Sequence, residues 1–465
     1  MEIHNLDSST NSNVIDSSAP ALTAPVRKHI GLRAYVGTFG TSVIVQCFTI
    51  VQGIIIARLL GPLGRGQYAA VILWPNVFAA IGIFGTNIAL ARAAAKTDRY
   101  DQVIRTSILL ALITASLSSI ACYLLLPYLL PQAEQQLLDL SRFFVIFIIL
   151  NHLALNLIAV DQGAGNFKRF NFTRAVLYPV YVSFLIVMWA TGVRQVKWAA
   201  IGLLVANLVV VLVRLGLVVK DMNLWGRLYS PIRAIKESIR FGLVGAAMPL
   251  YMQADKAILL WLLGAENLGL YVVALSASAA IGSITNSAGM VSFTAAAQVQ
   301  RGEGFEKIAK TFRMSALLWL VFGGILAIAM PLLLPLVYGG EFASAVNPAR
   351  LLIAGSAFAG LANLLDQSMR GQGRAFAGLE GRLAGIVVIA MLGMALSQPR
   401  GLMGMCLAFI FGQLVCMIVL VYCAIRNYGP DARFWNFVPG PADAVYGLNR
   451  TASVIKRPNV WRPFA

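Results

Sequence analysis

Charged residues are scarce in this chain. They make up 12% of its 465 residues, whereas 58% of the residues are hydrophobic. A soluble domain carries roughly 25% charged residues, so about half of the usual solvating surface is missing. This deficit excludes a soluble enzyme, a disordered regulator and a soluble nucleic-acid-binding domain, and it indicates a protein whose surroundings are largely lipid.

Cysteine and histidine are too few and too scattered for a metal or redox centre. The five cysteines lie inside apolar runs without a C-x-x-C pair, and the three histidines form no H-E-x-x-H motif. We expect no metal site and no cofactor, and we expect the cysteines to be small buried hydrophobic residues. No signal peptide is predicted, because Glu2 and Asp7 stand where a basic segment would be and no apolar run follows.

Long apolar segments are what the chain has in abundance. From Tyr35 onward, stretches of about twenty residues, the length that crosses a bilayer as a helix, alternate with short polar breaks. Twelve spans are predicted, at residues 35–57, 69–91, 107–130, 143–160, 175–193, 198–219, 241–263, 271–295, 314–336, 350–366, 383–398 and 401–425. Continuous apolarity of this length predicts helices rather than the alternating strands of a β-barrel.

These spans divide the chain into two halves with a tail at each end. The predicted parts are a disordered cytoplasmic tail (1–30), a first bundle of six helices (31–220), a cytoplasmic linker (221–240), a second bundle of six helices (241–425) and an irregular cytoplasmic tail (426–465).

The distribution of the basic residues predicts the orientation. The net charge is +18. With twelve spans, both tails and the polar breaks after spans 2, 4, 6, 8 and 10 lie on one side of the membrane. These segments contain 28 Lys and Arg residues, whereas the breaks on the other side contain 7. By the positive-inside rule both termini are therefore predicted to be cytoplasmic. A nucleic-acid-binding protein would instead gather its cations on a folded soluble face, so no nucleic-acid partner is expected.

Three short matches indicate that the second half repeats the first. The matched pairs are RLLGPLGRGQY at 58–68 with WLLGAENLGLY at 261–271, Asp161-Gln162 with Asp366-Gln367, and LLLP at 124–127 with LLLP at 332–335. Their offsets are 203, 205 and 208 residues, and six spans separate the copies. The halves should therefore be related by an axis along the membrane normal, with Gly61 and Gly264 in equivalent tight turns and Tyr68 and Tyr271 in the interfacial belt.

Polar side chains within the spans mark a candidate cavity. Serines and threonines of the first and eighth spans are predicted to pack between helices, as small polar residues do in membranes. For the four amides Gln46, Gln52, Asn87 and Asn286, helix packing and a water-filled cavity both remain open. His152 is predicted to be a packing residue with its hydrogen bonds satisfied, and Arg214 to reach the cytoplasmic interface from its span.

The seventh span carries the strongest candidate site. Asp255 and Lys256 lie past its midpoint, with Gln253 on the lysine's side of the helix. Each charge costs about 2.5–3.5 kcal/mol at the bilayer centre. Adjacent residues do not face each other on a helix, so each charge is expected to meet another helix or water. A structural ion pair with a neighbouring helix and an aqueous translocation cavity are the two explanations, and the cavity is favoured.

Several of these segments resemble bacterial polysaccharide-unit flippases, the O-antigen and exopolysaccharide translocases of the multidrug/oligosaccharidyl-lipid/polysaccharide exporter superfamily. The likeness covers about residues 33–425 and includes IIIARLLGPLGRGQYAAVILW and its continuation to Arg92, DKAILLWLLGAENLGLY, YGGEFASAVNPARLL and DQSMRGQGR. The resemblance implies an all-α integral membrane fold like that of the MATE transporters, with two six-helix bundles around a central cavity lined by spans 1, 2, 7 and 8.

The function that the resemblance implies is transport rather than enzyme catalysis. We expect a flippase that moves undecaprenyl-diphosphate-linked oligosaccharide to the periplasmic leaflet, with Lys256, and Arg58 at the outer end of span 1, offsetting the diphosphate charge. Coupling to Na⁺ or H⁺ is compatible with this function but not required by it. Expected partners are the lipid-linked oligosaccharide, membrane lipids, and a polysaccharide polymerase with other assembly proteins.

Two other functions remain open at this stage. A cation-coupled multidrug exporter of the same fold would use an intramembrane acid such as Asp255. A membrane-embedded glycan polymerase or ligase would need a large external loop, and no predicted external break exceeds about fifteen residues.

Overall fold

The computed structural model describes residues 32–97, 99–130, 135–219, 226–279, 282, 303–371, 377–428, 433–440 and 443. Within them the regular structure is helical and no strand occurs. Nine helical stretches of the described residues are long and apolar enough to cross a membrane. The chain is therefore a multi-pass membrane protein with an all-helical fold, as the apolar runs predicted.

Seven helices form the first half of the chain. They are α1 (Leu32–Gly82), α2 (Thr86–Lys96), α3 (Tyr100–Leu129), α4 (Gln135–Phe144), α5 (Ile146–Gly163), α6 (Phe167–Ala190) and α7 (Val196–Val219). The second half contains α8 (Pro231–Ser278), α10 (Glu303–Tyr338), α11 (Val346–Gly371) and α12 (Ala377–Tyr428), with short 3-10 helices η2 (Gly340–Ala345) and η3 (Phe434–Phe437).

Three of the longest helices contain a sharp break at a glycine. Gly61 in α1 has φ 65° and ψ −176°, and Gly264 in α8 has φ 79° and ψ −177°. Gly401 in α12 has φ 55° and ψ −138°. The first two conformations belong to a region that essentially only glycine adopts. The tight turns expected at Gly61 and Gly264 are therefore present and have nearly the same backbone geometry.

The polar breaks gather at the two ends of the molecule. At one end, the guanidinium Nε of Arg58 in α1 donates to the carbonyl oxygen of Val337 in α10 over 2.8 Å. At the other end, Arg92 pairs with Glu237 over 3.3 Å, and the Thr106 hydroxyl donates to the Tyr229 carbonyl over 2.8 Å. The first contact joins the polar breaks that follow spans 1 and 9, and the other two contacts join the breaks that follow spans 2 and 6. Odd-numbered and even-numbered breaks therefore lie at opposite ends, as expected of a chain whose spans cross the membrane in alternate directions.

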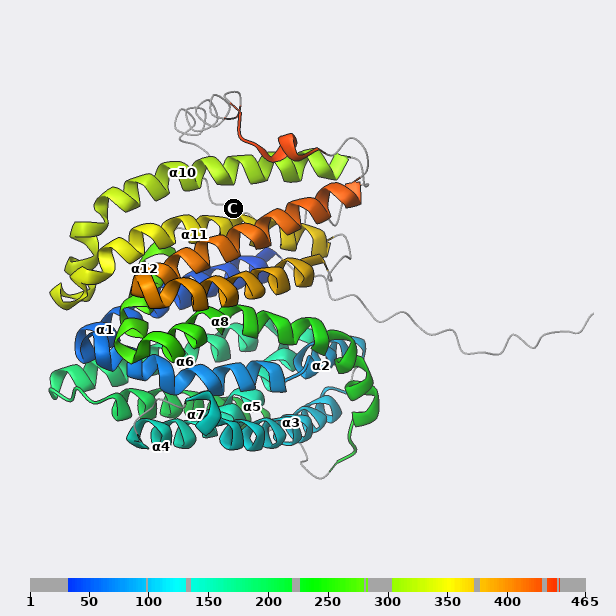
Figure 1. Cartoon of the computed structure of the whole chain (residues 1–465). Helices are drawn as coiled ribbons and strands as arrows, with labels where there is room; N and C mark the ends of the chain where they lie inside the picture. The colour runs from blue at the N-terminus through cyan, green and yellow to red at the C-terminus, as the bar shows by residue number, and fades with distance from the viewer. Residues whose placement is uncertain are drawn as a thin grey trace, which may run out of the picture.

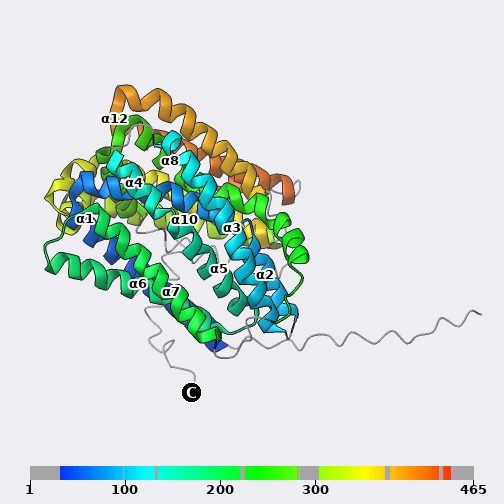
Figure 2. The same ribbon diagram turned by 90° about the horizontal axis from the view of Figure 1, so that it is seen from below.

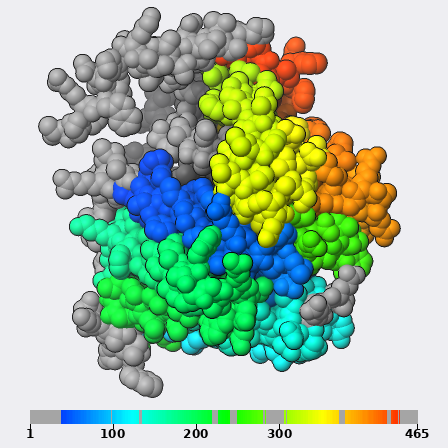
Figure 3. Space-filling model, turned by 90° about the vertical axis from the view of Figure 1, so that its left-hand side faces the viewer, coloured from blue at the N-terminus to red at the C-terminus, as the bar shows by residue number. Residues whose placement is uncertain are grey.

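The two parts of the chain meet along α1 and α8. Figure 1 shows α10, α11 and α12 in one layer and α3, α4, α5 and α7 in the other, with α8 running between them. In the perpendicular view of Figure 2, α12 lies at one edge and α6 and α7 at the opposite edge. Figure 3 shows the blue surface of α1 between the yellow surface around α11 and the green surface of α6 and α7. Residues from α1 and α8 consequently occupy the middle of the fold.

Two boundaries differ from those expected from hydropathy. α8 begins at Pro231, within the stretch 221–240 that was predicted to be a linker. The Ser230 hydroxyl accepts a hydrogen bond from the Arg233 backbone N–H, and proline follows at the first helical position, so a good helix start lies ahead of the apolar run. Within the predicted C-terminal tail, Phe437 is buried against Phe305 and Phe312 of α10.

Candidate functional site

Lys256 lies on α8 with its ammonium group turned back toward its own helix. Its Nζ donates to the carbonyl oxygen of Met252 over 2.7 Å and to Oε1 of Gln253 over 3.0 Å, and it lies 3.8 Å from Oδ1 of Asp255. The expectation that side chains 255 and 256 would not meet is therefore wrong, because the long lysine stem bends back far enough to bring the charges together. The side chain of Lys256 is still 19% exposed, whereas that of Asp255 is 3% exposed.

The Asp255 carboxylate is bound by a residue that lies after the turn at Gly264 in α8. The Tyr271 hydroxyl donates to Oδ2 of Asp255 over 2.7 Å, while Oδ1 of Asp255 has no hydrogen-bond partner. Tyr271 is fully buried and its ring packs edge-on against Phe409 of α12. The carboxylate is thus fixed to the protein core, and its lysine neighbour is the part of the pair that reaches the surface.

The tyrosines of the two matched segments, Tyr68 and Tyr271, are both buried. Tyr68, which aligns with Tyr271, is 3% exposed, and its hydroxyl lies 2.7 Å from that of Tyr181 in α6. The prediction that Tyr68 and Tyr271 lie in the interfacial belt is wrong, because each hydroxyl finds an internal hydrogen-bond partner. The role of Tyr271 was missed from sequence, although its distance of sixteen residues from Asp255 across the predicted turn was a usable signal.

The remaining predicted site residues lie apart from this group. Gln46 is exposed on α1, and Gln52 and Asn87 are half-buried. Among the residues that the structure describes, no hydrogen bond joins any of these three amides to Lys256 or Asp255. Asn286 lies outside the described residues.

Arg58 contacts the other half of the chain. Its guanidinium donates to the carbonyl oxygens of Val337 and Leu336, near the C-terminal end of α10. These are helix-end carbonyls, which lack partners within their own helix. Arg58 is also exposed, so in this arrangement it joins α1 to α10 at one end of the molecule.

Part of the polar stripe on α1 packs against α6. The Asn171 side-chain amide donates to the Thr38 hydroxyl over 3.1 Å, and the Arg174 guanidinium donates to the Ser42 hydroxyl over 2.9 Å. These contacts confirm helix packing for Thr38 and Ser42. His152 is likewise buried, with Nε2 2.9 Å from the Ala79 carbonyl oxygen and Nδ1 2.9 Å from the Thr114 hydroxyl, as expected.

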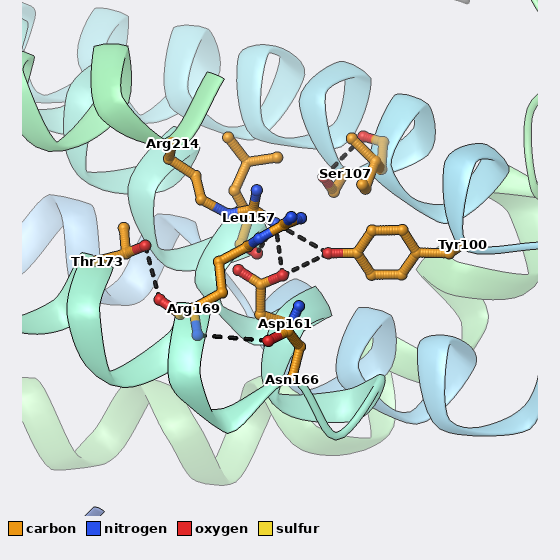
Figure 4. Close-up of polar contacts among 9 residues, drawn as sticks. Tyr100, Ser107, Leu157, Asp161, Asn166, Arg169, Thr173 and Arg214 are labelled. Atoms are coloured by element: carbon orange, nitrogen blue, oxygen red, sulfur yellow. Dashed lines mark hydrogen bonds and ion pairs between the residues drawn. The ribbon is translucent and has the colours of Figure 1, made fainter. Parts of the chain in front are cut away.

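A second charged cluster lies at the C-terminal end of α5 (Figure 4). Oδ1 of Asp161 lies 2.8 Å from the Arg214 guanidinium of α7 and accepts a hydrogen bond from the Tyr100 hydroxyl of α3. Arg214 also donates to the Tyr100 hydroxyl over 3.1 Å. Both charged side chains are 0% exposed, so the prediction that Arg214 reaches the interface is wrong. Its ion pair with Asp161 lies within the first half and joins α5 to α7.

The equivalent aspartate of the second half has the same kind of partner. Asp366 of α11 is buried and accepts hydrogen bonds from Arg382 of α12 and from Arg370 one turn further along its own helix. The Arg370–Asp366 distance is 2.8 Å. The two matched Asp-Gln pairs in the sequence therefore both mark buried, arginine-paired carboxylates.

Cysteine contributes packing rather than chemistry. Cys122, Cys406, Cys416 and Cys423 are buried, while Cys47 is exposed, which corrects the expectation for that residue. No group of three or more His, Cys, Asp or Glu side chains suited to a metal ion occurs in the described part of the chain. The group around Lys256 therefore consists of its ammonium, the buried Asp255 carboxylate and the amide of Gln253.

Comparison with solved structures identifies the class to which this fold belongs. A multidrug resistance MATE family transporter of the MOP superfamily in an inward-facing conformation gives a TM-score of 0.65 at 16% identity, over 88% of this chain and 95% of that one. The outward-facing conformation of such a transporter gives 0.58 at 17% identity, over 91% and 96%. A MOP superfamily transporter from Pyrococcus furiosus gives 0.55 at 14% identity, over 85% and 94%. The fold is that of the MOP transporters.

The family follows from the sequence. Residues 36–300, more than half of the chain, match the family of polysaccharide biosynthesis proteins. The chain belongs to that family, as the resemblance predicted. Comparison with curated proteins found no match.

Proposed function

We propose that the chain is a flippase for undecaprenyl-diphosphate-linked oligosaccharide. It moves the glycolipid from the cytoplasmic to the periplasmic leaflet of a bacterial inner membrane, for synthesis of a surface polysaccharide. The single observation that carries the proposal is the match of residues 36–300 to the polysaccharide biosynthesis family in a chain with the fold of a transporter.

The proposed architecture has twelve crossings in two bundles of six helices. The proposal takes the glycine breaks in α1, α8 and α12 as the boundaries between pairs of spans, so that the nine candidate stretches correspond to twelve crossings. The matching backbone angles at Gly61 and Gly264 support a parallel repeat. The asymmetry of the basic residues supports cytoplasmic termini. Reporter fusions at Arg426 and within 197–198 should report opposite compartments; the same compartment for both would contradict this topology.

The proposed substrate-binding surface lies between the bundles and centres on Lys256. An ammonium that keeps contact with the surface attracts the diphosphate, while the buried Asp255 and Gln253 hold it in position. Gln46, Gln52, Asn87 and Asn286 are proposed to replace water around the sugar hydroxyls. The lipid tail remains in the bilayer while the polar headgroup crosses.

The proposed cycle needs no cofactor. A membrane potential that is negative inside favours outward movement of an anion by about 2.3 kcal/mol per charge per 100 mV. The proposed cycle therefore does not require coupling to Na⁺ or H⁺, and an experiment must show whether such coupling occurs.

Deletion of the gene tests this function. The expected result is loss of the surface polysaccharide with accumulation of its lipid-linked repeat unit on the cytoplasmic leaflet, restored by the wild-type gene. Normal polysaccharide in the deletion strain would contradict the proposal. A polysaccharide polymerase acting on the periplasmic product is the expected functional partner.

A multidrug exporter is the second candidate, because solved relatives of the same fold are multidrug resistance transporters and α8 carries a buried acid. In that case deletion would sensitise cells to cationic dyes, and Asp255→Asn would abolish dye efflux while leaving surface polysaccharide intact.

A further inference from the structure

Two hollows flank α4 at the end of the first half where the odd-numbered breaks meet. The first has a volume of about 1140 Å³ and lies between the turn of α1, α4 and the start of α7. The second has a volume of about 350 Å³ and lies between α3 and α5. Neither includes Lys256 or Asp255, so they are separate from the site described above.

The larger hollow has the chemistry of a carbohydrate site. Its wall contains three glutamines (Gln67, Gln136 and Gln195) and the charged groups of Asp139, Arg194 and Lys197. The Phe143 ring, which is 48% exposed, forms part of the same wall and offers an aromatic face. Amide and charged groups bind hydroxyls, and ordinary ligand pockets measure roughly 300–1,000 Å³, so this volume can hold more than one sugar ring.

The smaller hollow is apolar and faces outward. Exposed side chains of Ile120, Leu124 and Ile146 line it, as expected of a surface in contact with lipid chains. Two polar atoms on its wall, the Ser119 hydroxyl oxygen and Nε of Arg142, are buried and have no hydrogen-bond partner. The groove itself fits a lipid chain, and the Arg142 side chain, which is 30% exposed as a whole, places a cation beside it.

Arg142 connects the two hollows. Its guanidinium lies over the Tyr123 ring at 5.3 Å, on the side of the apolar groove, and 3.5 Å from Asp139, which lines the polar hollow. Arginine is suited to phosphate because its planar donors match two oxygens at once. A molecule with a lipid chain, a phosphate group and sugars would thus find suitable surfaces in that order around α4.

We propose that this surface is a binding site for the translocated glycolipid at the outer leaflet. The polyprenyl chain lies in the groove between α3 and α5, the diphosphate faces Arg142, and the first sugars occupy the polar hollow. This inference rests on the proposed flippase function and adds a product site to it. The hollow shares the segment 60–67 with the turn of α1, so the bound product touches the segment through which the two halves meet.

Binding measurements on the full chain in nanodiscs of zwitterionic lipid test the site. The probes are the lipid-linked oligosaccharide from the deletion strain, the free glycan released from it by mild acid, and undecaprenyl diphosphate. Arg142→Gln should weaken binding of both lipid probes at least tenfold, whereas Phe143→Ala should weaken only the two sugar-containing probes. Arg350→Gln, an arginine at the start of α11 in the other half, is the matched control and should change none of them.

Three results would overturn the proposal. The first is that undecaprenyl diphosphate binds wild type and Arg142→Gln with equal affinity. The second is that Arg350→Gln weakens binding as much as Arg142→Gln does. The third is that phosphatidylglycerol at equal concentration displaces the probes, which would make the groove an ordinary lipid site. Because Lys256 is proposed to attract the same diphosphate, the probes are also compared in the Lys256→Ala background, where the tenfold effect of Arg142→Gln should persist. A variant that loses transport but keeps this binding therefore separates the two sites.

Discussion

Gly66 and Gly269 occupy equivalent places on the two sides of one close contact. A Cβ added at Gly66 would lie 1.6 Å from the carbonyl oxygen of Ala265, and one added at Gly269 would lie 1.9 Å from the carbonyl oxygen of Pro62. Both glycines and both carbonyls are separated by 203 residues in sequence. The contact is therefore reciprocal, and α1 and α8 approach each other here with backbone against backbone.

Alanine at either glycine should open this contact. Because each Cβ would overlap a facing carbonyl, Gly66→Ala and Gly269→Ala should both push the turns of α1 and α8 apart and slow transport by a similar factor, at least several-fold. Spin labels at Leu63 and Trp261, which are exposed on the two segments, should report a longer distance in each variant. Gly324→Ala, where a Cβ meets no atom within 4 Å, is the control. A large effect from one glycine and none from the other would contradict the reciprocal contact.

Gly264 provides a test of backbone conformation alone. A Cβ at this position meets nothing within 4 Å, but its φ of 79° disfavours every other residue. Gly264→Ala should therefore lower the free energy of unfolding by about 1–3 kcal/mol. Thermal denaturation in detergent measures this, with Gly216→Ala in α7, also without neighbours within 4 Å, as the matched control. Equal melting temperatures for the two variants would show that the turn is not constrained.

The buried pair of Asp161 and Arg214 should be sensitive to removal of either partner alone. Asp161→Asn leaves the Arg214 charge uncompensated at a fully buried position, so a loss of about 3–5 kcal/mol is expected. Replacing both, as Asp161→Leu with Arg214→Met, should recover most of that loss, because neither charge then remains. Asp139→Asn, in the exposed pair with Arg142, should cost less than about 1 kcal/mol.

If the double replacement is as unstable as Asp161→Asn, the loss comes from packing or from the Tyr100 hydrogen bond rather than from an unpaired charge. Chemical denaturation of the three variants in one detergent makes the comparison.

Asp443 should make the attachment of the C-terminal segment dependent on pH. A hydrogen bond from the Gly440 backbone N–H, and then the Arg313 guanidinium 2.8 Å away, lower the pKa of Asp443 below its ordinary value of 3.8. A carboxyl with a lowered pKa stabilises the folded state above its unfolded pKa, and that contribution is lost as the pH falls through the folded pKa. The protection factors of amides in residues 433–440, taken relative to the intrinsic exchange rate at each pH, should therefore be high at pH 6 and fall as the pH drops below the ordinary carboxyl pKa of 3.8.

Asp443→Asn should show the lowered protection factors at both pH values. Protection in that variant at pH 6 equal to wild type would mean that Phe437, rather than the carboxylate, holds the segment on α10.

The sequence predicted an all-helical chain with several membrane spans, because a lipid surrounding imposes length and apolarity on each span. It also located the glycine turns, since the match between 58–68 and 261–271 placed Gly61 and Gly264 in equivalent positions. It could not show that α8 starts at Pro231, because that first part of the helix is polar and hydropathy reports only the apolar part. Helix starts depend on local capping, which Ser230 supplies.

The polar contacts inside the fold were harder to predict. Burial of a charge depends on whether a partner from a distant segment reaches it, and Arg214 is separated from Asp161 by 53 residues of sequence. Tyr271 is recognised as the partner of Asp255 only once the turn at Gly264 folds one part of α8 against the other. Hydropathy and spacing predict on which face of a helix a residue lies. They do not predict the side-chain conformation in which the Lys256 ammonium reaches the Met252 carbonyl oxygen.

Lys256 should be required for transport but not for folding. Its ammonium contacts only its own helix in the described structure, at Met252, Gln253 and Asp255, so Lys256→Ala breaks no link to another helix. The variant should insert and accumulate normally, but cells that carry it in place of wild type should lack the surface polysaccharide. Lys256→Arg should retain part of the activity, because charge is kept while the compact ammonium geometry is lost.

The most direct test of the flippase account is translocation in proteoliposomes that contain only this protein and its lipid-linked oligosaccharide. Wild type should move the labelled glycolipid between leaflets far faster than protein-free liposomes, Lys256→Arg at an intermediate rate and Lys256→Ala at the protein-free rate. Translocation by Lys256→Ala at the wild-type rate would contradict the electrostatic role of this residue. If correctly inserted wild type exports a cationic dye but does not move the glycolipid, the proposed flippase function is contradicted.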